Sequence, residues 1–119
     1  MAHRETIQEL RAPTAQLRGM IPGAWGAFAD LHGAAMADGA VPTRLKEATA
    51  LAIAVVKGCD GCIAYHAKAA ARAGASLDEV AEMLAVALLM DGGAASVHGP
   101  RAWDAFVEFA GETRAVAVR

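Results

Sequence analysis

Residues 47–79, EATALAIAVVKGCDGCIAYHAKAAARAGASLDE, decide the fold of this chain. Residues 48–56 are apolar on nearly every side of a helix, which is typical of a helix buried in a core. Gly58 is expected to end that helix, and a second one follows over residues 60–73 before Gly74, because glycine readily adopts the positive φ needed at a helix C-terminus. The pattern predicts two helices that run back along each other.

Two more helices are expected on the N-terminal side of this pair. Residues 5–20 predict one helix, or two short ones broken near Pro13, because proline interrupts helical hydrogen bonding. Residues 22–40 predict another, with a proline in its first turn. The buried helix is then expected to begin after Pro42, with Thr43 as its N-cap.

Helix signals continue on the C-terminal side. Ser76 and Glu79 have the spacing of a capping box for a helix that ends near Met90. A last helical region is expected to be kinked or split at residues 99–100, a Gly-Pro pair. Because no β-branched run or hairpin signal is present, the sequence predicts an all-α fold, a single compact helical domain of about six helices over residues 1–119.

Composition and charge disfavour several classes of protein. A net charge of -2 with scattered basic residues gives no footprint for nucleic acid or an anionic membrane surface. The longest apolar stretches, residues 48–56 and 83–90, are too short to span a membrane. Residues 1–10 lack the apolar segment of a signal peptide, so we expect a cytoplasmic protein. In that compartment a C-x-x-C pair is more often catalytic or metal-binding than a structural disulfide.

The hydrophobic share predicts that the protein is a homo-oligomer. At 55% it is high for a chain of 119 residues, which has limited room to bury apolar surface. The helices at 48–56 and 83–90 are expected to be buried on all sides. Large aromatic side chains on the flanking helices are then the candidates for subunit contact, since aromatics anchor interfaces. The candidate side chains are Trp25, Phe28, Trp103 and Phe106.

The two cysteines are the centre of the candidate site. Cys59 falls at a helix N-terminus, where free amide donors and the helix dipole favour a thiolate. Cys62 and His66 are four residues apart and therefore share a helix face. Glu47 lies in an apolar helix that is costly for a carboxylate without a partner. If the chain reverses at Gly58, Glu47 and His66 come to similar heights on adjacent helices, which predicts a proton relay.

Two other interpretations of these residues stay open. Cys59, Cys62 and His66 could supply three ligands to a structural zinc ion, with His98 or Glu47 as the fourth. Alternatively, both thiols are inert and buried. In either case the protein would be a non-catalytic oligomeric helical module.

The remaining histidines are expected to have no role in this site. His3 and His32 are predicted to be solvated, and His98, just before the Gly-Pro pair, is predicted to be a loop or surface histidine. Tyr65 is most simply an anchor in the core or in an interface.

The pattern formed by Glu47, Cys59, Cys62 and His66 resembles the active-site motif of alkylhydroperoxidase D-like proteins, a group within the carboxymuconolactone decarboxylase superfamily. The similarity covers roughly residues 20–110. It implies an all-α fold and a homo-oligomer, either a trimer or a hexamer made of trimers. It also implies that the dithiol reduces a peroxide substrate without a bound cofactor or metal, with electrons from an external dithiol donor of the lipoyl or thioredoxin type.

The resemblance also implies a role for each residue. Cys62 attacks the peroxide and becomes a sulfenic acid, Cys59 resolves it as a disulfide, and His66 and Glu47 relay the proton. The sequence departs from the best-known members at Gly61, where they carry a second histidine. The decarboxylases of the superfamily work without this cysteine pair. The leading interpretation is therefore a thiol-dependent (alkyl hydro)peroxidase or disulfide reductase.

Overall fold

Helices account for almost all of the chain in the computed structural model, which describes residues 1–118. Across these residues there are six helices and no strand, which confirms the predicted all-α fold of about six helices. The helices are α1 (Ala2–Met20), α2 (Pro22–Met36), α3 (Thr43–Lys57), α4 (Asp60–Ala73), α5 (Leu77–Asp91) and α6 (Gly93–Val118).

Most of the predicted helix ends are confirmed. Gly58 and Gly74 end α3 and α4 in the left-handed region, at φ 64° and 89°. Ser76 and Glu79 form the predicted capping box at the start of α5. The backbone hydrogen bond from Ser76, together with Arg44 of α3, lowers the pKa of the Glu79 carboxyl. The capping box therefore also ties α5 to α3.

Three local predictions were wrong. Thr43 is the first residue of α3 and not its N-cap; its N–H donates to Asp38 Oδ1 at 2.8 Å. This bond, from a free N–H at the helix start, lowers the pKa of Asp38. Helix α2 ends at Met36 and does not reach residue 40. Helix α6 runs through Pro100 as one helix, so it is not split at the Gly-Pro pair, whereas α1 runs through Pro13 as the single helix that was one of its two expected forms.

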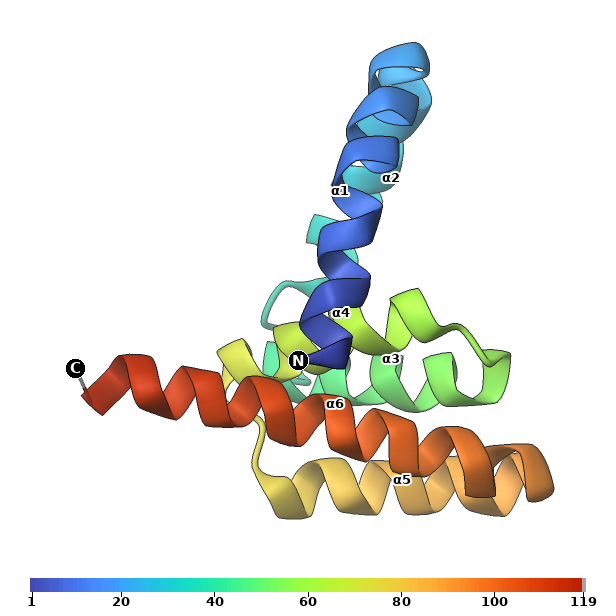
Figure 1. Ribbon diagram of the computed structural model, residues 1–119, viewed down its shortest axis with the longest axis vertical. Helices are drawn as coiled ribbons and strands as arrows, with labels where there is room; N and C mark the ends of the chain where they lie inside the picture. Colours follow the sequence, from blue (N-terminus) through green and yellow to red (C-terminus); the bar gives the residue numbers. More distant parts are fainter. Residues whose placement is uncertain (119) are drawn as a thin grey trace.

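Four helices form the body of the molecule, and two extend from it. Helices α3 and α6 pack on each other and on both α4 and α5, and α1 contacts α4 through its N-terminal half, where Ile7 is buried. Figure 1 shows α1 and α2 running side by side away from the other four helices. None of the buried side chains belongs to α2. We call α1 and α2 together the arm.

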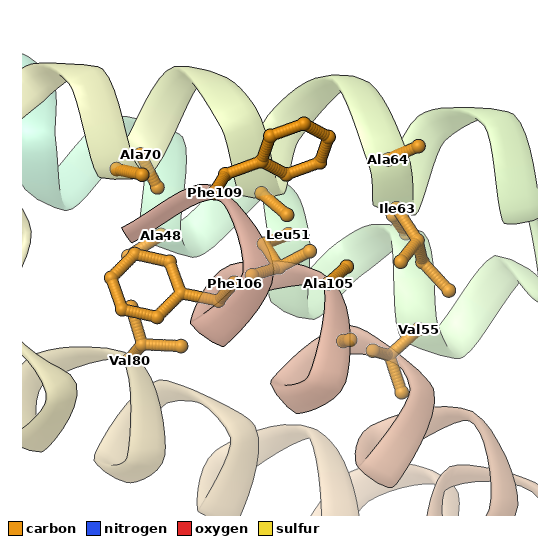
Figure 2. Close-up of a cluster of buried hydrophobic side chains, with 14 of the residues drawn as sticks. Ala48, Leu51, Val55, Ile63, Ala64, Ala70, Val80, Ala105, Phe106 and Phe109 are labelled. Carbon is orange, nitrogen blue, oxygen red and sulfur yellow. The ribbon is translucent and has the colours of Figure 1, made fainter. Parts of the chain in front are cut away.

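The core lies between α3, α4, α5 and α6. Figure 2 shows Phe106 of α6 near Leu51 of α3 and Val80 of α5, and Val55 of α3 beside Ala105 of α6. Phe106 is fully buried, so its predicted role in subunit contact was wrong. The face of α6 that carries Phe106 packs against the core, and the spacing of aromatic residues alone does not predict which face of a helix is buried.

The helices expected to be buried on all sides are buried on one side only. In α3, Ile53 and Val56 are 52% and 45% exposed. In α5, Leu89 and Met90 are 81% and 76% exposed. The reason is that neither helix has a neighbour in this chain on its outer face. No helix within residues 1–118 is long and apolar enough to cross a membrane.

Candidate active site

The turn between α3 and α4 positions the cysteines. Because Gly58 adopts a left-handed conformation, the N–H of Cys59 can reach back to the carbonyl of Ala54 at 3.2 Å, which closes the end of α3. Cys59 is then the N-cap of α4, and its Sγ accepts a hydrogen bond from the N–H of Cys62 at 3.1 Å. The two cysteines form a disulfide, with their Cα atoms 5.2 Å apart.

Glu47 and His66 are brought together by the reversal of the chain. Glu47 on α3 is only 3% exposed and is the one charged residue in the described part of the chain that is buried. Its Oε2 lies 3.2 Å from Nδ1 of His66 on α4, within hydrogen-bonding distance. This pairing satisfies the buried carboxylate and leaves Nε2 of the imidazole for other partners.

A cavity of about 640 Å³ lies where α4 meets the base of the arm. Its walls combine the two cysteines and His66 with mainly apolar or weakly polar groups. The lining residues are Thr6, Glu9, Leu10, Phe28, His32, Cys59, Gly61, Cys62, Tyr65 and His66. The redox-capable sulfurs and an imidazole therefore face a space large enough for a small organic molecule.

Gly61 has a steric explanation in this cavity. A Cβ added at Gly61 would lie 3.2 Å from Cδ1 of Leu10 on α1, closer than ordinary van der Waals contact. A larger side chain at position 61 would therefore have to displace Leu10. The contact with α1 therefore favours glycine before Cys62.

His32 also belongs to this site, although the sequence did not predict it there. It was expected to be a solvated histidine, and although it is exposed, it lies in the cavity wall with its ring stacked on that of His66. The ring centroids are 6.5 Å apart and the planes differ by 22°. His32 and Phe28 are four residues apart on α2, and both line the cavity. The sequence pattern that could have indicated His32 is this spacing, which places the two side chains on one face of the helix.

The other two histidines also differ from expectation. His3 is not solvated: its Nε2 lies 2.9 Å from Oδ2 of Asp104, and its side chain is only 16% exposed. His98 lies within α6, which contradicts the expected loop, and its partly exposed side chain packs on Gly58. In residues 1–118, no group of three or more His, Cys, Asp and Glu side chains is arranged to hold a metal ion.

The chain matches the Carboxymuconolactone decarboxylase family over residues 22–108. It is 40% identical over 81 residues to an uncharacterized protein of Cupriavidus necator, covering 68% of this chain and 72% of that one. It is 41% identical over 76 residues to an uncharacterized protein in the cox locus of Paracoccus denitrificans, covering 64% and 68%. The fold is similar to the crystal structure of an apo carboxymuconolactone decarboxylase family protein from Legionella pneumophila, with a TM-score of 0.88, 32% identity, and coverage of 92% of this chain and 97% of that one.

Proposed function

This chain belongs to the carboxymuconolactone decarboxylase family, and from its cysteine pair we propose that it is a thiol-dependent peroxidase. One observation carries the proposal: Cys59 and Cys62, bonded to each other, line one cavity together with a histidine that is held by a buried carboxylate. A thiol near an imidazole is a common arrangement for a nucleophilic sulfur.

The proposed reaction has two steps. In the first, the Cys62 thiolate attacks the terminal oxygen of the peroxide; an S–O bond forms, the O–O bond breaks, and the sulfur loses two electrons to the leaving oxygen. The leaving oxygen takes a proton and departs as an alcohol or as water. In the second step, the thiol of Cys59 attacks the Cys62 sulfenic acid, and water leaves as the disulfide forms.

His66 and Glu47 serve the first step. Cys62 and His66 are one helical turn apart on α4, so the imidazole is placed to take the thiol proton, directly or through a water molecule. Glu47 holds Nδ1 of the ring, which fixes the tautomer and orients Nε2 away from the carboxylate. The disulfide is then reduced by an external dithiol donor of the lipoyl or thioredoxin type, with no bound cofactor. With a disulfide as the electron acceptor, the same cycle would be that of a disulfide reductase.

The cavity and the chemistry also indicate a substrate class and a compartment. A space of about 640 Å³ with Leu10, Phe28 and Tyr65 in its walls suits an organic hydroperoxide better than hydrogen peroxide. The proposed cycle needs a pool of reduced dithiols, which the cytoplasm maintains. We therefore propose that the protein acts in the cytoplasm.

Peroxide consumption with dihydrolipoamide as the reductant tests this function. We expect the protein to consume cumene hydroperoxide catalytically, with one dithiol oxidised for each peroxide reduced. Zinc content is measured on the same sample. A protein that consumes no peroxide with dihydrolipoamide or with a thioredoxin system, and that carries about one zinc per chain, would be the non-catalytic module instead.

We also propose that the protein is a homo-oligomer, a trimer or a hexamer. The support is an apolar groove of about 240 Å³ between the outer faces of α3 and α5, lined by Ile53, Val56, Val86 and Met90 among others. All four of these side chains are at least 45% exposed in the single chain. Exposed apolar patches of this kind usually mark interfaces.

Light scattering at micromolar concentration tests the assembly. We expect a mass of three or six times 12.2 kDa, and we expect Leu89→Lys to shift it towards smaller species because Leu89 continues the exposed face of α5. Glu5→Lys, at an exposed position on α1 outside this groove, is the matched control and should leave the mass unchanged. A monodisperse, active species of 12.2 kDa would contradict the proposal.

A further inference from the structure

Two imidazoles face the candidate peroxide cavity, and only one of them has a role in the mechanism described above. His66 comes from α4 and is bonded to Glu47. His32 comes from α2, stacks on His66 with ring centroids 6.5 Å apart, and lines the same cavity as the cysteines. The planes of the two rings differ by only 22°, so the rings are stacked and are not hydrogen-bonded to each other.

The direction of the reaction distinguishes the two rings. A sulfur that displaces oxygen from a peroxide attacks along the line of the O–O bond, so the leaving oxygen points away from Cys62. His66 projects from the same helix as Cys62, one turn further along, and is well placed for the thiol proton. Cys62 and His66 line the cavity from α4, and its other walls come from the arm and include Phe28 and His32, so a leaving oxygen that points across the cavity from Cys62 can meet His32.

From this placement we propose that His32 is a catalytic general acid, which donates the proton that the leaving oxygen needs. The inference rests on the proposed peroxidase function. In the balanced step, Cys62 gives its thiol proton to His66, the S–O bond forms as the O–O bond breaks, and His32 in its protonated form gives a proton to the leaving alkoxide. His66 then returns a proton to solvent, and His32 takes one up.

The identity of the side chains supports this assignment. Among the side-chain types in the cavity wall, imidazole is the one whose ordinary charge change falls near neutral pH, which suits a proton donor that is recharged in each cycle. Gly61, the residue before Cys62, brings no titratable side chain to the cavity, and a Cβ there would lie 3.2 Å from Cδ1 of Leu10. His32 supplies a second imidazole to the same cavity from a different helix.

His32→Gln tests the proposal through the leaving group of the substrate. The reduced protein is mixed with cumene hydroperoxide, whose leaving alkoxide needs a proton, or with peracetic acid, whose leaving carboxylate does not. Thiol oxidation is followed by stopped flow. We expect the variant to be more than about tenfold slower with the hydroperoxide but within about threefold of the parent with the peracid. His3→Gln, which alters a histidine outside this cavity, should match the parent with both.

Two results would overturn the role of His32. Equal slowing with both oxidants would mean that the ring only shapes the cavity or orients His66. Rates equal to those of the parent with both would mean that it takes no part. Folding is not at risk, because His32 is exposed and α2 contributes no buried side chain. Failure of the proposed function is seen separately, as a parent protein whose thiols react with neither oxidant.

Discussion

Replacing Cys62 with serine is expected to abolish peroxide consumption in the coupled assay with dihydrolipoamide. Cys62 is the cysteine that shares a helix face with His66, and a serine hydroxyl at that position cannot take up the peroxide oxygen as a sulfenic acid does. The loss is expected to reach the uncatalysed background. The disulfide between Cys59 and Cys62 is also lost in this variant, so circular dichroism must first show that the helices are intact.

Cys59→Ser is the matched variant, because it removes the same disulfide but leaves the attacking sulfur in place. It is expected to react once with peroxide and to stop as a sulfenic acid on Cys62, which a dimedone probe labels. The roles would be reversed if the probe labelled Cys59 in the Cys62→Ser protein and found nothing in the Cys59→Ser protein.

Glu47→Gln is expected to slow the oxidation of the reduced protein by cumene hydroperoxide roughly 10²-fold, the low end of what a positioned acid–base group contributes. Glutamine keeps the shape of the side chain and can still bond to His66, but it lacks the negative charge that stabilises the imidazolium formed when the ring takes the thiol proton. Stopped-flow measurement of thiol oxidation gives the rate.

The control for this variant is Glu82→Gln, which removes a carboxylate from the exposed face of α5. Urea unfolding is measured on both, and the Glu47→Gln midpoint should stay close to that of the parent. An unchanged oxidation rate together with normal stability would mean that Glu47 is a satisfied buried polar group without a role in catalysis.

The arrangement of α3 and α4 could be predicted because its signals are local. Gly58 forces the reversal, Cys59 caps the next helix, and a rise of about 1.5 Å per residue puts Glu47 and His66 at similar heights. The distance of 3.2 Å between their polar atoms agrees with that estimate. Glu47 and His66 are separated by about twenty residues, and over so short a segment helix geometry fixes the distances.

His32 could not be placed in the same way, because its position depends on how the arm leaves the body. Its stacking on His66 joins residues 34 positions apart, with the whole of α3 and the connections on either side of it between them. The burial of Phe106 was missed for a related reason. In helices rich in alanine the apolar face is broad, so the side that turns inward is decided by the neighbouring helices and not by the local pattern. The exposure of Ile53 and Leu89 was not predicted, because an apolar sequence does not reveal whether the helix is buried by the same chain or by another.

Intact-mass measurement after a single equivalent of peroxide tests the central claim most directly. The protein is first reduced completely, the reductant is removed, and cumene hydroperoxide is added at one molecule per chain. We expect the mass of each chain to fall by about 2 Da, the two thiol hydrogens lost as the Cys59–Cys62 disulfide forms, and dihydrolipoamide to restore the original mass. A chain whose mass is unchanged, or one that gains oxygen and keeps it, would contradict the claim that this cysteine pair is a peroxide-reducing centre.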